Sequence, residues 1–359
     1  MNDTEINLIT NMSGDSGIGN YALELYRITH DYFPQMKLFS VPYIRGQKLD
    51  NSINLSTFYA GNILQIPFVN KFNFKRIKKS KQFAQKNIHI LGSDYSLVSA
   101  SEKAVATVHE YYFTVVGLQK STNARSFLRE IGYNYGMIKL HSKIKRFKKI
   151  IAPSHYSAAQ IRSHTGIKPE VVHETVDGSR FHYRDKKASR KLLGLPNSKV
   201  LLLNVSGDGI NKNLHILKKI SDSLSDDYRL IKIGAPIYSK NSINIGRVED
   251  KYYSIFFNAA DAYLNVSTNE GFNIPLIESM KSSLPVISNK CATAPELLGE
   301  SGIYVENPDM VQEYLELIHL GKDLDFLNYY SELINKRCSE FSDDKARREY
   351  IRIYSDVFR

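Results

Sequence analysis

The stretch Ser267-Thr-Asn-Glu-Gly-Phe-Asn-Ile-Pro-Leu-Ile-Glu-Ser-Met280 comes directly after a short apolar, β-prone run. Gly271 to Asn273 predict a loop at the carboxyl end of that strand, and Pro275 predicts a helix start because its missing N–H is not needed there. Helix starts attract anions, and ligands of α/β folds bind at this edge of the sheet. The stretch therefore predicts a parallel-sheet domain that holds a diphosphate, with the carboxylates of Glu270 and Glu278 placed to bind sugar hydroxyls.

The second half of the chain alternates strands with helices around this stretch. Short β-prone runs are separated by helical patterns such as Leu214 to Leu224 and Pro275 to Ser282. The predicted strands are Lys199 to Val205, Arg229 to Ile233, Ala262 to Val266 and Pro285 to Ser288. This order is typical of a doubly wound parallel sheet.

The first half repeats the same architecture without sequence identity. It opens with a buried strand at Ile6 to Ile9, a glycine loop from Asn11 to Gly19, and a helical pattern through Tyr21, Leu25 and Ile28. Further strands are predicted at Ile88 to Leu91, Ala104 to Val108 and Ile150 to Ala152. Gly17 and Gly19 lack a Cβ, so this first loop can approach a bound group closely.

A linker and domain entry are predicted between the halves. Residues from Gly166 to Pro196 are polar and charged and end in Gly194-Leu-Pro196. We therefore expect one Rossmann-like domain at residues 1–175 and a second at 176–342, with a final helix at about 343–359 packing back on the first domain.

Composition excludes several protein classes. The N-terminus is polar and acidic and lacks the apolar run of a signal peptide, and no apolar run approaches the length of about 20 residues that spans a bilayer. Cys291 and Cys338 are the two cysteines, too few for a disulfide framework or a cysteine zinc site. A cytoplasmic location is expected.

An ordered series of motifs resembles the retaining GT-B glycosyltransferases of family 4, also called glycosyl transferases group 1. The donor-site part of the series runs from Glu270 to Glu278 and continues through Leu284-Pro-Val-Ile-Ser288, Ala294-Pro-Glu296 and Gly302-Ile-Tyr-Val-Glu-Asn-Pro-Asp309. The remaining pieces occur in the family's order: Gly17-Ile-Gly-Asn-Tyr21, Val108-His-Glu110, Ala152-Pro-Ser154, Val176-Asp-Gly-Ser-Arg-Phe181 and Lys212-Asn213. The resemblance thus covers essentially the whole chain and implies an α/β protein with two Rossmann-like domains, whose parallel sheets face a central cleft.

The resemblance also implies roles for individual residues. Glu278 is expected to bind ribose hydroxyls, Glu270 the hydroxyls of the transferred sugar, and Lys212 the departing diphosphate, where a positioned cation stabilises growing charge. His109, from the acceptor-side first domain, is expected to reach the sugar or the reaction centre. Other expected donor contacts are the amides of Gly271, Phe272, Asn273 and Ile274, the loop glycines Gly17 and Gly19, and Arg247 near the base.

Three positions depart from the family's pattern. An arginine usually lies five residues before the lysine matched by Lys212, but this chain has Gly207 there, so another cation must substitute or leaving-group assistance is weakened. The family favours glycine where this chain has Asn273 and Ser283. We expect left-handed backbone angles at both, which asparagine tolerates better than serine.

No essential metal or other cofactor is expected, apart from the substrate, a nucleoside-diphosphate sugar. Asp323-Leu-Asp325 superficially resembles a metal-binding Asp-x-Asp, but it follows Leu320-Gly-Lys322 near a helix end rather than a buried strand. We interpret it as part of a surface helix. No histidine pair has zinc spacing.

Two basic segments account for much of the charge. The net charge is +11, and residues 1–175 hold 23 Lys and Arg against 12 Asp and Glu. Residues 71–81 and 139–149 interleave lysines with apolar side chains, including Phe72, Phe74, Ile77, Ile144, Phe147 and the adjacent Ile150. Such segments suit a solvated face or an interfacial helix on anionic lipid, and peripheral contact with the cytosolic membrane face is the interpretation we favour. Nucleic acid is not expected, since no reading motif accompanies the charge.

The expected activity is transfer of a sugar from a nucleoside-diphosphate sugar to a glycan or lipid-linked acceptor, with retention of anomeric configuration. The alternatives are another GT-B nucleotide-sugar enzyme, such as an epimerase, or a glucan phosphorylase, for which no pyridoxal-binding lysine signature is seen. A non-enzymatic alternative is a basic membrane- or nucleic-acid-binding protein on a degenerate scaffold of the same fold.

Overall fold

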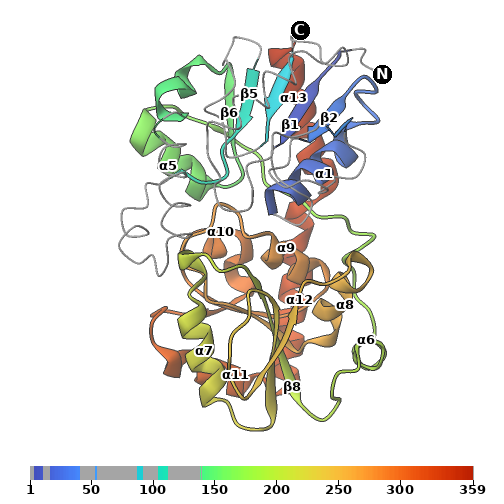
Figure 1. Cartoon of the computed structure of the whole chain (residues 1–359), viewed down its shortest axis with the longest axis vertical. Helices are drawn as coiled ribbons and strands as arrows, with labels where there is room; N and C mark the ends of the chain where they lie inside the picture. Colours follow the sequence, from blue (N-terminus) through green and yellow to red (C-terminus); the bar gives the residue numbers. More distant parts are fainter. Residues whose placement is uncertain are drawn as a thin grey trace. The chain divides into compact units, whose positions relative to one another are not determined.

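The computed structural model describes residues 4–10, 17–40, 53–54, 87–91, 104–111, 138 and 140–358. The chain divides into two compact units, one formed by Met1–Thr175 with Asp343–Arg359 and the other by Val176–Ser342. Figure 1 shows each unit as a sheet covered by helices.

The first unit is built on a parallel sheet. Within the described residues its strands follow the order β3-β2-β1-β4-β5-β6-β7. Their bounds are β1 Asn7–Thr10, β2 Lys37–Ser40, β3 Ile53–Asn54, β4 Ile88–Ile90, β5 Ala104–Thr107, β6 Lys149–Ala152 and β7 Glu170–Val171. The order reverses between β1 and β4, which is the switch point where doubly wound sheets bind ligands.

Alternate residues of these strands face two cores. On one face, Leu8, Val105 and Ile151 pack against α1 (Gly17–Thr29) and the C-terminal helix α13 (Asp343–Val357), which lie side by side. On the other face, Ile88, Ile90, Ala106 and Ile150 pack against α5 (His155–Thr165) and the segment around the short helix η2 (Ile144–Arg146). Strands buried on both faces explain the near-continuous apolar runs in the sequence.

The second unit contains a six-stranded parallel sheet in the order β10-β9-β8-β11-β12-β13. The strands are β8 Val200–Ser206, β9 Tyr228–Gly234, β10 Ser242–Gly246, β11 Ala262–Asn265, β12 Val286–Asn289 and β13 Gly302–Val305. Renumbered from the first strand, this is the 3-2-1-4-5-6 order of dinucleotide-binding folds, with its switch point between β8 and β11.

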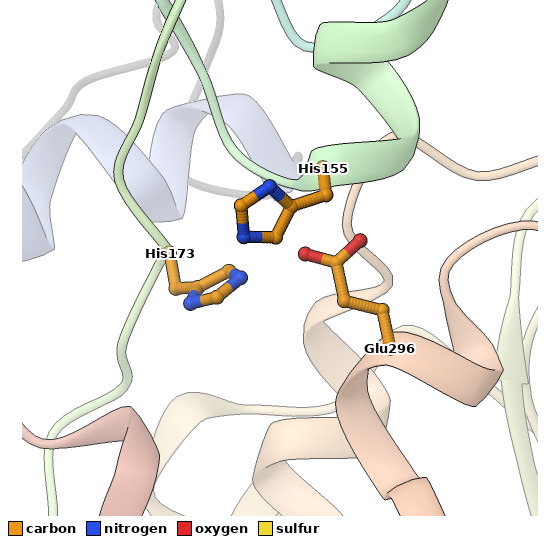
Figure 2. Close-up of side chains that lie close together, drawn as sticks. All are labelled: His155, His173 and Glu296. Carbon is orange, nitrogen blue, oxygen red and sulfur yellow. The ribbon is translucent and has the colours of Figure 1, made fainter.

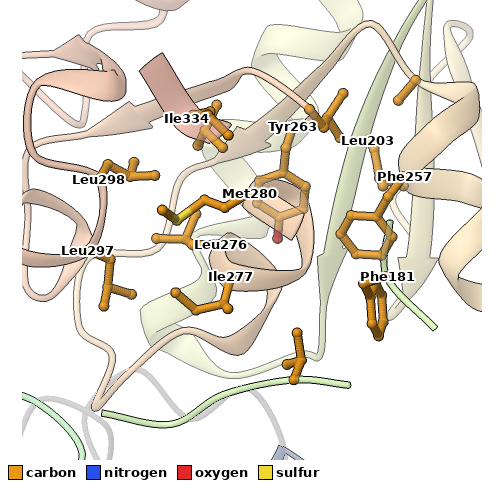
Figure 3. Close-up of a cluster of buried hydrophobic side chains, with 14 of the residues drawn as sticks. Phe181, Leu203, Phe257, Tyr263, Leu276, Ile277, Met280, Leu297, Leu298 and Ile334 are labelled. Carbon is orange, nitrogen blue, oxygen red and sulfur yellow. The ribbon is translucent and has the colours of Figure 1, made fainter. Parts of the chain in front are cut away.

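Helices cover both faces of this second sheet. One core joins the strands to α8 (Asp250–Ala259), α9 (Ile274–Lys281), α10 (Ala294–Leu298) and α12 (Leu324–Cys338), and Figure 3 shows Phe257, Leu276, Met280 and Ile334 meeting Leu203 and Tyr263 there. The opposite core joins them to α7 (Leu214–Ser223) and α11 (Val311–Leu320). Burial in both layers fixes β8 and β11 as the central strands of the sheet.

The segment from Gly166 to Pro196, predicted as a linker, is ordered instead. It contains β7 and the helix α6 (Lys186–Leu193), capped by the Asp185 side chain, which accepts a hydrogen bond from Ala188 N. Arg190 is buried, and its guanidinium pairs with Asp261 at 2.6 Å and donates to the Ala259 carbonyl at 2.8 Å. The division between the two units, after Thr175, falls within this segment, but a solvated linker is the wrong interpretation of its charges. They include the buried Arg190, whose acidic partner is distant in sequence.

The glycine loop also ends earlier than predicted. Helix α1 begins at Gly17, so Gly17 and Gly19 lie in its first turn, and Gly19 is buried. The two glycines therefore belong to a helix start that follows β1, rather than to the turn ahead of it.

Candidate functional site

The connection between β11 and α9 carries the predicted donor-site residues. Asn273 caps α9 in a left-handed conformation (φ 74°, ψ 66°), its side-chain amide donates to Asn265 Oδ1 at 3.2 Å, and Pro275 follows in the first helical turn. Ser283, just beyond the helix, is also left-handed (φ 58°). The prediction of left-handed angles at Asn273 and Ser283 is confirmed, and the connection is anchored at both ends.

Glu270 and Lys212 form an ion pair at the switch point of this sheet. Glu270 lies on the β11–α9 connection and is 7% exposed, whereas Lys212 ends the short helix η3 (Ile210–Lys212) that follows β8. The Lys212 ammonium group donates a hydrogen bond to Glu270 Oε1. The sequence predicted both residues for the site but gave them separate ligand contacts, so their mutual pairing is new information.

Hydrogen bonds between the two loops fix this pair. Thr268 N donates to the Asn211 carbonyl at 3.0 Å, the Asn211 side chain donates to the Asn269 carbonyl, and the Asn213 side chain donates to the Val266 carbonyl at 3.1 Å. The loop after β8 is thus bonded to the loop after β11 on both sides of the lysine. Asn213 belongs to the Lys212-Asn213 motif identified in the sequence, whereas Asn211, on the other side of the lysine, was not singled out.

Glu278 lies on α9 and is 3% exposed. Its Oε2 accepts a hydrogen bond of 2.9 Å from the hydroxyl of Tyr253, which belongs to α8. Burial, followed by the charge and the hydrogen bond of Glu278, raises the pKa of Tyr253 well above its ordinary value. The phenol therefore stays neutral and acts as a fixed donor that orients the carboxylate.

Both acids act on one phenol. Tyr263, on β11, is buried, and its hydroxyl donates to the Val205 carbonyl at 3.3 Å. Burial raises the pKa of Tyr263 most, and the charges of Glu278 and Glu270 raise it further. Both carboxylates therefore lie within electrostatic reach of the same buried hydroxyl.

The remaining predicted donor-site residues surround this connection. Gly271 and Phe272 are buried, and the Phe272 carbonyl accepts a hydrogen bond of 3.0 Å from the Thr293 hydroxyl. Ile274, half-buried, starts α9. Arg247 is exposed at the end of β10, which is the edge strand of the sheet and is separated from β8 by β9.

In the first unit, His109 follows β5 and is held from three sides. Its Nδ1 lies 3.0 Å from Glu174 Oε1, its Nε2 lies 3.3 Å from the Leu91 carbonyl oxygen, and its ring meets the edge of Tyr21 at 4.7 Å between centroids. Glu174, 4% exposed, was not identified from the sequence. Its only signal there is an acid in the otherwise uncharged β-prone run Val171-Val-His-Glu-Thr-Val176.

His155 and His173 also meet in the first unit. Their rings lie 5.8 Å apart in an edge-to-face arrangement, at the first residue of α5 and just after β7 (Figure 2). Glu296, the third side chain drawn there, belongs to α10 of the second unit. Two imidazoles are fewer than the three protein ligands of a catalytic zinc ion.

The Asp-x-Asp segment is part of a surface helix, as predicted. Asp323 caps α12, and its side chain accepts a hydrogen bond of 2.9 Å from Asp325 N. Both aspartates are exposed.

The two basic segments have different outcomes. Residues 71–81 lie outside the described residues, as does Lys139. In the rest of the second segment, Ile144 and Phe147 are buried in the core of the first unit, as is the adjacent Ile150, whereas Lys145, Arg146 and Lys148 are exposed. The prediction of an interfacial helix is wrong for residues 140–149, because their apolar side chains pack into the core of the first unit and leave polar and cationic side chains exposed.

No helix among the residues with described structure combines the length and apolarity that a bilayer span requires.

Comparisons with known proteins agree with the sequence resemblance. Residues 205–320 match the family model described as Glycosyl transferases group 1. The O-antigen chain mannosyltransferase RfbU of Salmonella typhimurium is 25% identical over 230 residues, which cover 59% of this chain and 61% of RfbU. The MMP alpha-(1->4)-mannosyltransferase of Mycolicibacterium hassiacum is 20% identical over 183 residues, which cover 47% of this chain and 43% of that enzyme. Each alignment therefore spans less than two thirds of the relative.

The fold is also found among solved structures. Anabaena Alr3699/HepE, crystallised in complex with UDP and glucose, superposes with a TM-score of 0.75 and 14% identity, covering 99% of this chain and 100% of that one. At this identity the likeness concerns the fold alone. The predicted GT-B fold with two Rossmann-like parallel sheets is confirmed.

Proposed function

Because residues 205–320 belong to the glycosyl transferases group 1 family and the chain has the GT-B fold, we propose that it transfers a sugar from a nucleoside-diphosphate sugar to an acceptor hydroxyl. We further propose that the anomeric configuration is retained. Mannosyltransferases among the relatives make a hexose the first donor class to test. The glycan or lipid-linked acceptor is the class that O-antigen enzymes among the relatives suggest.

One observation carries the proposal: a paired acid and lysine share the switch point of the second sheet with a second buried acid. Glu270 lies on the connection after β11, Lys212 ends the short helix after β8, and Glu278 lies in the second turn of α9, the helix that follows Glu270. A diphosphate bound there lies beside a cation, and the sugars on either side of it lie beside carboxylates. This is the charge distribution that a nucleoside-diphosphate sugar requires.

Each residue then has a proposed task. Glu278, oriented by Tyr253, accepts hydrogen bonds from ribose hydroxyls, and Glu270 accepts them from the transferred sugar. Backbone N–H groups from Gly271 to Ile274 bind the sugar and phosphate. For Gly17, Gly19 and Arg247 the proposed role is donor contact, at the diphosphate for the glycines and at the base for the arginine. For His109 it is contact with the transferred sugar or the reaction centre.

The chemical step breaks the bond between the anomeric carbon and the diphosphate oxygen, and the diphosphate leaves with the bonding electron pair. The acceptor oxygen forms the new bond and loses its proton, which balances the charge on the leaving group. Lys212 is the cation nearest this event in the proposal, since fixed positive charge stabilises a departing anion.

The test is a thermal-shift panel of UDP-, GDP- and ADP-sugars with the wild type and Glu278→Ala. A bound donor raises the melting temperature by mass action, and the shift should be lost in Glu278→Ala. Glu332→Gln, at an exposed acid of α12, is the matched control and should shift like the wild type. A wild type that no nucleotide sugar stabilises would contradict the proposal.

A second assay separates transfer from the alternatives. Release of nucleoside diphosphate should require an acceptor, whereas an epimerase would convert the donor without releasing it. A protein that only binds membranes or nucleic acid would ignore nucleotide sugars and respond steeply to salt. These outcomes distinguish the three functions with the same preparation.

We also propose that the protein binds peripherally to the cytosolic face of a membrane. In the described part of the second basic segment, residues 140–149, this contact is electrostatic, between exposed cations and anionic lipid headgroups. Lys145, Arg146 and Lys148 are exposed there, and each cation near an anionic surface contributes about 1 kcal/mol. Binding to vesicles containing anionic lipid should therefore vanish at high salt. Persistence of binding in molar salt would instead require apolar insertion.

A further inference from the structure

A lysine is fully buried in the second sheet. Lys232, on β9, has no exposed surface and ranks among the largest completely buried side chains. Its ammonium group donates to the Ser206 carbonyl at 2.6 Å and to the Ile233 carbonyl at 2.8 Å. Among the described residues no carboxylate pairs with it. Lysine is rarely buried without such a partner, because desolvating its charge is costly.

Lys232 lies beneath the carboxyl edge of the sheet where the donor diphosphate is proposed to bind. Ser206 ends β8, and Gly234 ends the adjacent β9, paired with it in register. Gly234 is left-handed (φ +93°), and a Cβ on it would lie 2.4 Å from the same Ser206 oxygen that Lys232 binds. The ends of β8 and β9 therefore pack tightly around the Ser206 carbonyl. The next residue, Gly207, is exposed, and the position of a Cβ on it is open space.

The carboxyl edge of the sheet has little free positive charge with which to bind a diphosphate. The Lys212 ammonium is already paired with Glu270, so the pair offers little net positive charge to a diphosphate. Burial, followed by the charge of Lys212, lowers the pKa of Lys232 to about 7. Among the described residues, Lys212 is the charged group that lowers the pKa of Lys232. The hydroxyl of Tyr263, which is neutral, donates a hydrogen bond to the Val205 carbonyl near the end of the adjacent strand β8.

Hydrogen counting shows what a bound anion would change. A neutral amine has two N–H groups, and the Ser206 and Ile233 carbonyls accept both. Protonation adds a third N–H and a full charge, and no carboxylate of the described residues is hydrogen-bonded to the amine: Glu270 is paired with Lys212, and the carboxylate of Asp208, exposed beside Gly207, has no ion pair with Lys232. A diphosphate above the Ser206–Gly207 peptide would supply that negative charge and would favour the protonated form.

We propose that Lys232 supplies the second positive charge of the diphosphate site, in place of a cation at Gly207, and that it takes up a proton when a nucleoside diphosphate binds. It acts through the Ser206–Gly207 peptide group, whose carbonyl it polarises, and is therefore a positioning residue rather than one that touches the substrate. This inference rests on the proposed function, because it assumes that the edge binds a diphosphate.

The experiment is calorimetric titration of the full chain with UDP and GDP at pH 8, in buffers that differ in ionisation heat. With a pKa of about 7, Lys232 is mostly neutral at pH 8, so we expect the wild type to take up close to one proton per bound nucleotide. Uptake should fall as the pH is lowered below 7. Lys232→Met should abolish the uptake and weaken binding about tenfold or more. Lys219→Met, at an exposed lysine of α7, should change neither.

The outcomes separate this inference from the proposed function. If the wild type binds nucleotide without proton uptake, or if Lys232→Met retains the uptake, the role of Lys232 is overturned while the donor site stands. If the wild type binds neither UDP nor GDP nor any nucleotide of the thermal-shift panel, the proposed function fails and this inference fails with it. The pH profile of the wild type is decisive even if Lys232→Met does not fold.

Discussion

Lys212 and Glu270 are hydrogen-bonded to each other between the loops that follow β8 and β11, although the proposed function assigns each of them to a different part of a nucleotide sugar. The lysine is partly exposed and the acid nearly buried, at 26% and 9% of their side-chain surfaces. In the proposed function, an arriving diphosphate competes with Glu270 for the ammonium group. The released carboxylate then becomes available to the sugar, so the two contacts form together.

Glu270→Gln should therefore separate binding from transfer. Removing the acid frees Lys212, and we expect the affinity for a nucleoside diphosphate alone to rise about fivefold, while sugar transfer falls by about two orders of magnitude. Titration calorimetry with UDP or GDP and a turnover assay measure the two effects. Lys212→Met should instead weaken diphosphate binding. Equal loss of affinity in both variants would show that the pair is structural and is not broken by the ligand.

Tyr253→Phe should weaken nucleotide binding through Glu278. Loss of the 2.9 Å hydrogen bond leaves the carboxylate less well oriented, and an effect of about 1 kcal/mol corresponds to a roughly fivefold rise in Kd. Tyr252→Phe, at the neighbouring position of α8, is the matched control. If Glu278 binds ribose hydroxyls, the penalty should disappear with a 2′,3′-dideoxynucleotide. A penalty that persists with that ligand would place Glu278 elsewhere.

Glu174→Gln should weaken the positioning of the His109 ring and so lower the catalytic rate, while the imidazole itself stays in place. The carboxylate fixes one ring nitrogen of His109 at 3.0 Å, so its neutral replacement should lower kcat about tenfold and leave KM for the donor within twofold. His109→Ala should lower kcat further. Steady-state kinetics check both variants, with Glu332→Gln as the control. A loss of melting temperature that accounts for the lost activity would assign Glu174 to folding alone.

The sequence predicts the sheets well because their strands are buried on both faces and appear as short apolar runs. It also predicts Asn273 and Ser283 as left-handed, since the motif demands glycine-like angles there. Both features depend on local pattern. The sequence is least informative where charged residues are buried: the charges of α6 resemble a linker, and nothing in the strand pattern of β9 distinguishes the buried Lys232 from a lysine at a solvent-facing position.

Contacts between residues that are distant in sequence are the second feature that the sequence does not predict. Lys212 with Glu270 and His109 with Glu174 are 58 and 65 residues apart in sequence, and periodicity contains no information on such contacts. The same applies to Ile144 and Phe147, whose spacing among lysines fits a lipid-facing helix as well as it fits a core edge. Only the three-dimensional arrangement separates those two cases.

Ala292→Gly should stabilise the second unit. Ala292 has φ 51°, a left-handed conformation that costs a residue with a Cβ about 1 kcal/mol, and part of the gain is offset by the greater freedom of glycine in the unfolded chain. We expect a rise of about 2 °C in melting temperature, measured by calorimetry. Ser283→Gly relieves a similar angle but loses a 2.7 Å hydrogen bond to Asn335, so its gain should be smaller. A destabilised Ala292→Gly would show that the side chain contributes packing that outweighs the backbone.

The buried His89 should make the first unit sensitive to acid. Its Nδ1 lies 2.6 Å from the Tyr354 hydroxyl and its Nε2 lies 2.8 Å from the Thr107 hydroxyl, linking α13 to the sheet. Burial, followed by the charge of His109, lowers the pKa of His89 to about 3, whereas in the unfolded chain it is about 6.5. Between these values the unfolded state binds the extra proton, so stability falls as the pH drops below 6.5 and continues to fall to about 3.

This single group should cost about 2 kcal/mol of unfolding free energy on going from pH 7 to pH 5. Denaturant titrations at the two pH values measure the difference, and His89→Gln should reduce it by that amount even if the variant is less stable at both. His215→Gln, at an exposed histidine of α7, should leave the difference unchanged. An unaltered pH dependence in His89→Gln would mean that the ring gains a proton without unfolding, and that the contact between α13 and the sheet tolerates a charged imidazole.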